Sequence, residues 1–315
     1  MRTQLDSYSI KTKNKARKGR VGVDKTLYFM LIPGIILITI FNYGPLFGLA
    51  MAFQKYNIAQ GILKSEFIGL ENFVYLFTKY PNFWTIVQNT VEIASMKMVV
   101  NFIAPIVVTL LLNEVINLKF KRITQTLIYL PHFVSWVIIS GILITTLSPT
   151  NGIINTIIAY FGLDPIYFLG RNDTFRSVLI SSEVWKTFGW GTIIYMAGLT
   201  GIDPALYEAA TIDRANRFQK IWHITLPGLT PVIILNLILN MPNVLNAGFD
   251  QIFNLYNPMV YKSADVLDTF IYRLGILDAQ YDLSTAVGLC KSVISAIILI
   301  ASYKIAYKVS DYRIF

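Results

Sequence analysis

The feature that most constrains this chain is a series of six apolar stretches separated by polar segments. A helix needs about 20 mostly apolar residues to cross the hydrocarbon core of a bilayer, and backbone groups in lipid must find their hydrogen bonds within the protein. The sequence therefore predicts an all-α membrane protein with six transmembrane helices. The expected spans are residues 26–53, 83–115, 124–147, 175–199, 227–245 and 284–307.

The composition agrees with a membrane protein and excludes several other classes. The chain has 315 residues, of which 54% are hydrophobic and 14% are charged, whereas soluble domains have about 25% charged residues. The net charge of +9 does not indicate nucleic-acid binding, because lysine and arginine gather at the cytoplasmic ends of spans. Cys290 is the only cysteine, which excludes an intrachain disulfide, and two histidines are too few for a metal site.

The first 25 residues predict the orientation in the membrane. They carry eight basic residues against two aspartates, and such a segment stays in the cytoplasm. The first apolar stretch is too long for the core of a signal peptide, which has about 7–15 residues. Six spans then leave both termini in the cytoplasm, with a transmembrane domain over residues 26–315. The connection at residues 200–226 also lies in the cytoplasm.

A short amphipathic helix is predicted within this connection, from about Pro204 to Ile212. Asp203 is a favoured N-cap residue, and proline is favoured at the first helical position. Leu206, Ala209 and Ala210 recur at the spacing of one helix face. The helix would present a small apolar patch with charged neighbours to another protein.

The same connection resembles the EAA loop of binding-protein-dependent ABC importers. Glu208-Ala209-Ala210, Ile224 and Leu226-Pro227 stand at the spacing of that motif. An ordinary amphipathic loop is the alternative, and the fixed spacing over some twenty residues argues against it. Arg214 stands where the family usually has glycine, which costs about 1–2 kcal/mol if the turn needs a positive φ. The resemblance implies that this loop couples the membrane domain to an ATPase through Leu206, Glu208, Ala209, Ala210, Asp213, Arg214 and Ala215.

Segments outside this loop are similar to the complex-carbohydrate branch of sugar permeases. They lie at residues 41–45, 67–73, 129–133, 185–191 and 246–254. The resemblance implies the type I importer fold in a bacterial plasma membrane. It also implies four kinds of partner: a second permease, two ATP-binding subunits, an extracellular solute-binding protein, and a polysaccharide or oligosaccharide substrate.

The chain is expected to carry no catalytic residues and no cofactor of its own. It has no Gly-Lys-Ser or Gly-Lys-Thr, and so no P-loop, and no nucleophile elbow or His-Glu-x-x-His pair. ATP and magnesium would therefore be held by the partner ATPase subunits. An embedded enzyme is a weaker alternative. The main alternative is an ion- or proton-coupled transporter that uses membrane carboxylates as a relay, although this leaves the EAA loop unexplained.

Several polar and aromatic residues within or near the spans are candidates for the substrate path. Glu183 and Lys186 are neighbours on one helix, and ion pairing that holds the helices together is as good an interpretation as substrate contact. Asn236, Asn240 and Asn243 recur on one helix face. Their amides suit sugar hydroxyls, and hydrogen bonding between helices is the alternative. The predicted path residues are Glu183, Trp185, Lys186, Trp190, Asn236, Asn240, Asn243, Asp250, Gln251, Asn254 and Lys291.

Overall fold

The structure is a computed structural model that describes residues 25–310. The predicted cytoplasmic tail lies almost wholly outside the described residues. The chain divides into two compact units, one up to Gly48 and one from Leu49 onward, and each is described by itself.

The first unit is helical. It contains α1 (Lys25–Ile38), the π-helical turn η1 (Thr39–Tyr43) and the beginning of the 3₁₀ helix η2 (Gly44–Phe53). The backbone N–H of Gly44 donates to Thr39 O across the π-turn. Pro45 follows directly, and it has no N–H to donate. The wider turn before the proline lets the helix continue through it.

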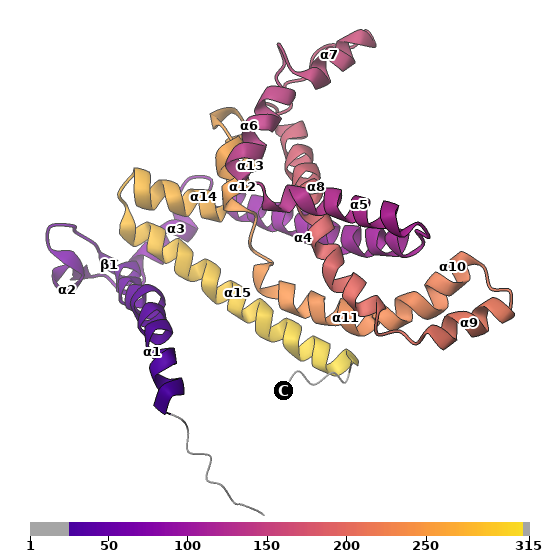
Figure 1. Ribbon diagram of the computed structural model, residues 1–315. Helices are drawn as coiled ribbons and strands as arrows, with labels where there is room; N and C mark the ends of the chain where they lie inside the picture. The colour runs from indigo at the N-terminus through magenta and orange to yellow at the C-terminus, as the bar shows by residue number, and fades with distance from the viewer. Residues whose placement is uncertain (1–24, 311–315) are drawn as a thin grey trace, which may run out of the picture. The chain divides into compact units, whose positions relative to one another are not determined.

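The second unit begins with a small two-stranded loop structure and continues as a helical bundle (Figure 1). Strands β1 (Gln54–Lys55) and β2 (Glu66–Phe67) pair antiparallel, with Gln54 opposite Phe67. The helices before the bundle are α2 (Gly61–Lys64) and α3 (Glu71–Thr78). The bundle then contains α4 (Phe83–Asn113), α5 (Leu118–Tyr129), η3 (Leu130–Phe133), α6 (Trp136–Thr146), α7 (Ile153–Tyr160), α8 (Asn172–Leu199), α9 (Pro204–Ile212), α10 (Arg217–Lys220), η4 (Ile221–Thr225) and α11 (Leu226–Asn240).

The remaining elements lead from α11 to the last long helix. They are η5 (Met241–Asn243), α12 (Phe249–Leu255), η6 (Pro258–Val260), α13 (Tyr261–Ala264), α14 (Leu267–Tyr272), η7 (Arg273–Leu277) and α15 (Tyr281–Ser310). Figure 1 shows α15 running beside α11, while α9 and α10 form a hairpin at one end of the bundle. This hairpin occupies the connection that resembles the EAA loop.

Four helices in the described part of the chain are long and apolar enough to cross a membrane. They are Tyr28–Phe53, Phe83–Asn113, Arg217–Asn240 and Tyr281–Lys304, and the bent pair α5–η3 with α6 makes a fifth candidate. Helix α8 has 28 residues but carries Arg176, Glu183 and Lys186 along its length. With α8, each of the six predicted spans has a helix, and the expected all-α membrane fold is confirmed.

The third span differs from the single helix that the sequence predicts. The chain bends by 99° between Leu118–Phe133 and Trp136–Thr146. Pro131 removes one backbone donor at the bend, and Val134 is extended. Ser135 then caps the new helix by accepting a hydrogen bond from the N–H of Ile138 at 3.4 Å. The span is therefore two helices with a sharp corner between them.

The fifth helical segment begins ten residues earlier than the predicted start at Pro227. It runs without interruption from Arg217 to Asn240. The π-turn η4 precedes Pro227, and the N–H of Leu226 donates to Ile221 O across it. This π-turn accommodates Pro227, which has no N–H to donate, just as η1 accommodates Pro45. Pro227 therefore lies inside the helix.

Two buried clusters hold the second unit together. One joins α4 and α8 to the α12–α14 segment, with Ile93, Phe175 and Ile252 fully buried. The other packs α3 and the start of α4 against α14 and α15, around Leu76 and Phe270. The segment between α11 and α15 is thus fixed to the two central helices, and this positions the loop that closes the site described next.

Candidate functional site

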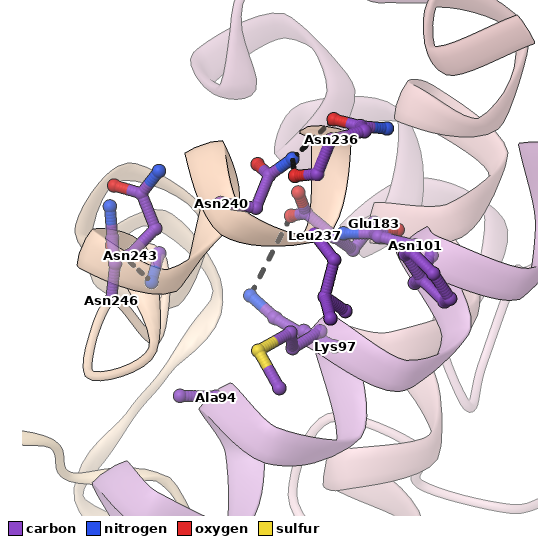
Figure 2. A pocket seen from close by; sticks show the side chains of 12 residues that line it. Ala94, Lys97, Asn101, Glu183, Asn236, Leu237, Asn240, Asn243 and Asn246 are labelled. Atoms are coloured by element: carbon purple, nitrogen blue, oxygen red, sulfur yellow. Dashed lines mark hydrogen bonds and ion pairs between the residues drawn. The ribbon is translucent and has the colours of Figure 1, made fainter. Parts of the chain in front are cut away.

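A polar cavity of about 250 Å³ lies among α4, α8, α11 and the turn that follows α11. We call it the asparagine cavity, because five asparagines line it. Figure 2 shows the asparagines of α11 and its following turn on one side and Lys97 of α4 on the other. The five are Asn101, Asn236, Asn240, Asn243 and Asn246. The predicted face of Asn236, Asn240 and Asn243 therefore lines one wall of a cavity.

Part of the hydrogen-bonding capacity of these amides is used within the protein. Asn236 donates to the hydroxyl of Tyr195 at 2.7 Å, and Asn240 donates to Oδ1 of Asn236 at 2.6 Å. Asn101 Oδ1 accepts from the hydroxyl of Thr187 at 3.0 Å. Within the described residues, Oδ1 of Asn240 and both Oδ1 and Nδ2 of Asn243 have no hydrogen-bond partner in the protein. The cavity thus presents donors and acceptors together, which is what a sugar hydroxyl requires.

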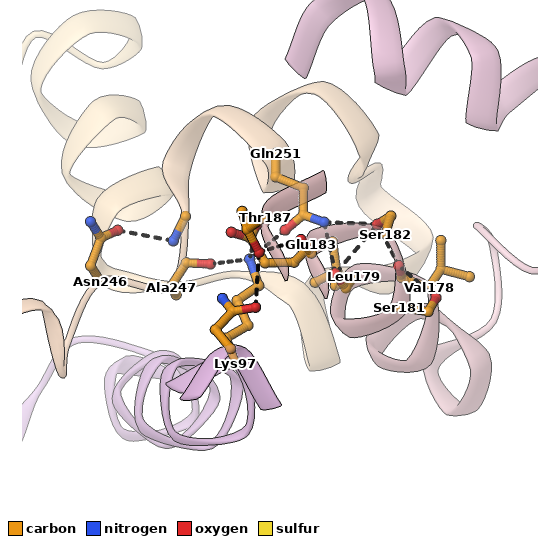
Figure 3. A network of polar contacts seen from close by, with 12 residues as sticks. Lys97, Val178, Leu179, Ser181, Ser182, Glu183, Thr187, Asn246, Ala247 and Gln251 are labelled. Carbon is orange, nitrogen blue, oxygen red and sulfur yellow. Dashed lines mark hydrogen bonds and ion pairs between the residues drawn. The ribbon is translucent and has the colours of Figure 1, made fainter. Parts of the chain in front are cut away.

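Lys97 closes the floor of the cavity and joins three elements (Figure 3). Its ammonium donates to Ala247 O at 2.6 Å and to Oε1 of Gln251. It also lies 3.6 Å from Oε2 of Glu183. The charge is thereby balanced by a carboxylate and solvated by two oxygens, as a buried cation requires. Lys97 ties α4 to α8 and to the loop before α12.

Gly248 makes room for this arrangement. Its φ of 87° is in a region that favours glycine. A Cβ at this position would lie 2.8 Å from Lys97 Nζ. Gln251 completes the floor, donating to Leu179 O and to Ser182 Oγ, both at 2.8 Å. It was predicted as a substrate contact, and the structure places it behind the cavity, fully buried.

The structure does not pair Glu183 with Lys186, an arrangement that the sequence left open. Glu183 turns to Lys97, while Lys186 reaches the corner in the third span. The Lys186 ammonium donates to His132 O and to Val134 O, both at 2.7 Å. A cation at the C-terminal end of a helix is stabilised by the helix dipole and by the unpaired carbonyls there. Lys186 therefore caps the helix that ends at the corner.

The other predicted path residues lie apart from the asparagine cavity. Trp185 is 51% exposed on another face of α8. Trp190 stacks on His132 with ring centroids 4.5 Å apart. Lys291 pairs with Asp268 of α14. Asp250 is exposed on α12, where its carbonyl accepts a hydrogen bond from Asn254 at 2.7 Å.

Two asparagines that sequence reasoning did not assign to the path also line the cavity, namely Asn101 and Asn246. Asn101 stands four residues after Lys97, so the two share a face of α4, and that spacing was the available signal. Asn246 opens the segment whose resemblance to sugar permeases was noted. Its Oδ1 accepts a hydrogen bond from the N–H of Gly248 at 3.0 Å.

The α9–α10 hairpin is a second candidate site. Helix α9 has the predicted bounds, and Asp203 accepts a hydrogen bond from the N–H of Ala205 at 2.9 Å. No residue of α9 is buried in this chain, and Leu206 is 52% exposed. Phe218, at the start of the next helix, is 84% exposed. The hairpin therefore exposes large apolar side chains on both of its helices.

The turn after α9 has a positive φ at the position where the EAA loop, which it resembles, usually has glycine. Arg214 has a φ of 55°. Its N–H donates to Thr211 O at 3.1 Å, and the N–H of Ala215 donates to Ala210 O at 2.9 Å. This pair of bonds is the Schellman arrangement, in which the residue that follows the C-cap adopts a left-handed conformation. The sequence-based concern about a positive φ at Arg214 is therefore confirmed.

The hairpin is closed by polar contacts between its arms. The hydroxyls of Tyr207 and Thr225 lie 2.9 Å apart, and Lys220 donates to the hydroxyl of Thr211 at 2.8 Å. Asn216 and Gln219 form a reciprocal capping box at the start of α10. These contacts give the hairpin a defined shape in this chain.

Comparison with known proteins finds one matching family and close relatives. Residues 101–314 match the family described as "binding-protein-dependent transport system inner membrane component". The chain is 40% identical over 291 residues to the polygalacturonan/rhamnogalacturonan transport system permease protein YteP of Bacillus subtilis (strain 168), covering 92% of this chain and 90% of that protein. It is 41% identical over 292 residues to the protein LplB of the same organism, covering 93% and 92% of the two chains.

Solved structures also match over nearly the whole chain. One is a bacterial ABC transporter involved in the import of the acidic polysaccharide alginate, with a TM-score of 0.84 and 39% identity over 91% of this chain and 96% of that one. Another is the bacterial alginate ABC transporter in complex with an alginate pentasaccharide-bound periplasmic protein, with a TM-score of 0.85 and 38% identity over 92% and 97% of the two chains.

Proposed function

The chain belongs to the family of binding-protein-dependent transport system inner membrane components, and from this we propose that it is the permease subunit of an ATP-driven importer of oligosaccharides or complex glycans. Its relatives named for polygalacturonan and alginate support a glycan as the cargo. The observation that carries the proposal is the asparagine cavity, whose free amide groups can both donate to and accept from sugar hydroxyls.

Transport proceeds by alternating access in this proposal. ATP binding closes a dimer of partner ATPase subunits, and the α9–α10 hairpin moves with them. The cavity between this chain and a second permease then opens outward to receive cargo from a solute-binding protein. Glu208, Ala209, Ala210 and Asp213 lie on or beside α9 and carry the mechanical contact. This orientation puts both termini and the hairpin in the cytoplasm.

An ion-coupled mechanism is less well supported by the contacts of the membrane carboxylates. Glu183 is held by Lys97, and Glu92 is paired with Arg176. A proton relay needs carboxylates that can gain and lose a proton during the cycle. Carboxylates fixed by cations from a neighbouring helix serve to hold α4 and α8 together.

Replacing Asn240 with leucine tests the proposed role of the cavity. The change removes an amide that has a free acceptor facing the cavity and puts an apolar side chain in its place. We expect uptake of the native oligosaccharide to fall by about tenfold or more, because an unpaired sugar hydroxyl costs about 1–3 kcal/mol. Basal ATP hydrolysis by the assembled complex should stay nearly intact. Both rates are measured on the complex in liposomes.

Asn151→Leu is the matched control, because Asn151 is an exposed amide outside the cavity. It should leave uptake and hydrolysis unchanged. The proposal fails if Asn240→Leu transports the oligosaccharide like the control. If instead Asn240→Leu prevents assembly of the complex, the asparagines hold helices together and do not form a path.

A further inference from the structure

A second pocket, of about 590 Å³, lies at the N-terminal end of α4, away from the asparagine cavity. We call it the Lys262 pocket. Thr85 in this pocket and Lys97 in the cavity are separated by about 18 Å along α4, at 1.5 Å per residue. Its volume falls within the range of about 300–1,000 Å³ that small-ligand sites occupy. The polar and aromatic residues that line it are Tyr80, Asn82, Thr85, Tyr261, Lys262, Asp265 and Arg273.

The charges that line this pocket do not cancel. Arg273 pairs with Asp265 through two hydrogen bonds, so these two groups balance each other. Lys262 is exposed, and its ammonium makes no salt bridge within the described residues. The pocket therefore carries one uncompensated positive charge, which suits a monoanionic ligand.

The walls of the pocket are fixed before any ligand binds. Asn89 of α4 donates to Lys262 O and to Asp265 O, both at 3.1 Å. Arg176 of α8 donates to Ser263 O at 3.0 Å. The Arg273 guanidinium lies over the ring of Tyr261 at 5.1 Å. A site whose groups are already held in place binds with less loss of entropy.

The neutral groups of the pocket fit a ring that carries hydroxyls. Asn82 is exposed and makes no side-chain capping bond to α4, so its amide can donate and accept. The phenol of Tyr80 is protonated at neutral pH and can donate a hydrogen bond, and burial raises its pKa further. The edge of the pocket therefore combines a cation with hydroxyl-binding groups and an aromatic ring.

We propose that the Lys262 pocket binds a hexuronate residue of an acidic oligosaccharide, with the Lys262 ammonium on the carboxylate and with Asn82 and Tyr80 on ring hydroxyls. The inference rests on the proposed function, because it gives the importer a recognition site for acidic sugar on the side of the membrane opposite the α9–α10 hairpin. Cargo released there would meet this pocket before it reaches the asparagine cavity.

The test is direct binding to the complete complex of this chain with its partner permease and ATPases in nanodiscs, without the solute-binding protein. Trigalacturonate is titrated by calorimetry and compared with the same trimer after reduction of its carboxylates to alcohols. We expect the acidic trimer to bind about tenfold more tightly, which is the effect of one hydrogen bond to a charged group. Equal binding of the two trimers would overturn the proposal.

Lys262→Gln should lower the affinity for trigalacturonate to that for the neutral trimer, and Lys262→Arg should keep most of it, because arginine retains the charge. Lys64→Gln is the matched control, since Lys64 is an exposed lysine of α2 outside the pocket, and it should bind like the parent protein. An unchanged affinity in Lys262→Gln would refute the role of this lysine.

Two further arms distinguish a sugar site from a lipid site and from the asparagine cavity. Glycerol 1-phosphate has the same anionic group as a lipid headgroup. If it binds in a way that depends on Lys262 and trigalacturonate does not, the pocket is a lipid site and the proposal is wrong. Asn240→Leu should keep the preference for the acidic trimer, because the asparagine cavity is a different site. If that preference disappears in Asn240→Leu and persists in Lys262→Gln, the cavity function stands and the pocket proposal falls.

Discussion

A single residue, Arg214, adopts a strained conformation at the turn of the α9–α10 hairpin. Its φ of 55° is unfavourable for a residue with a Cβ. Arg214→Gly should therefore stabilise the hairpin by about 1 kcal/mol, somewhat offset by the greater freedom of glycine in the unfolded chain. We expect about fivefold slower amide hydrogen exchange in α9 and α10 of the assembled complex, measured by mass spectrometry.

Arg214→Ala separates the backbone from the side chain in this experiment. Alanine keeps the Cβ and its strain but lacks the guanidinium. Exchange in Arg214→Ala should stay close to that of the parent protein. Equally slow exchange in the alanine and glycine variants would show that the arginine side chain, and not φ, limits the stability of the turn.

Sequence reasoning at this scale succeeded where the relevant contacts are local. The spacing of Asn236, Asn240 and Asn243 follows from helix geometry alone, and the structure places all three around one cavity. The partners of Lys97 could not be predicted in the same way. Ala247 and Gln251 lie about 150 positions further along the chain, and only the tertiary fold brings them to the ammonium.

Among the helices, the sharp corner in the third span is the element that the sequence did not reveal. Hydropathy measures apolar length, and a broken helix satisfies it as well as a straight one. The corner depends on Lys186 of α8, which binds carbonyls at the end of η3. Pro131 indicated where the helix could break, but the lysine that binds the exposed carbonyls is more than fifty residues away in the sequence.

Lys186→Met should destabilise this corner. The change leaves His132 O and Val134 O without their charged donor, and hydrogen bonds to charged groups contribute about 1.5–3 kcal/mol each. We expect the assembled complex to unfold at a lower temperature, as measured by the fraction that remains monodisperse after heating. Lys186→Arg should recover part of the loss, because it supplies the same charge.

Lys119→Met is the control for this element, since Lys119 is an exposed residue of α5 that does not contact the corner. It should unfold at the temperature of the parent complex. If Lys186→Met also behaves like the parent, water satisfies these carbonyls equally well and Lys186 is not required to hold the corner.

At the scale of the whole molecule, the α9–α10 hairpin is the proposed link between this chain and its ATPase partners. Glu208→Lys should detach the ATPase or uncouple hydrolysis from uptake while the membrane fold stays intact. Glu208 is exposed on α9, so reversing the charge of this side chain places no charge in lipid. Losing a charge pair at an interface costs about 2–5 kcal/mol. ATPase retained on the purified complex, stimulated hydrolysis and uptake are the three readouts.

Glu71→Lys provides the same charge reversal on α3, outside the hairpin, at another exposed glutamate. It should leave all three readouts close to those of the parent complex. Glu208→Lys behaving like Glu71→Lys in every readout would show that the hairpin does not couple the two activities, and the mechanism built on it would have to be abandoned.

The floor of the asparagine cavity sets a boundary on how this transporter can be adapted to new cargo. Even a methyl group at Gly248 would lie 2.8 Å from the Lys97 ammonium, which joins α4 to α8 and to the loop before α12. The side chain of Asn243 has no protein partner within the described residues. Asn243 can therefore be substituted without disturbing the contacts of Lys97. Directed evolution of substrate range should therefore accumulate substitutions at position 243 and none at position 248. Within this short loop, one residue then sets substrate selectivity while another maintains the structure.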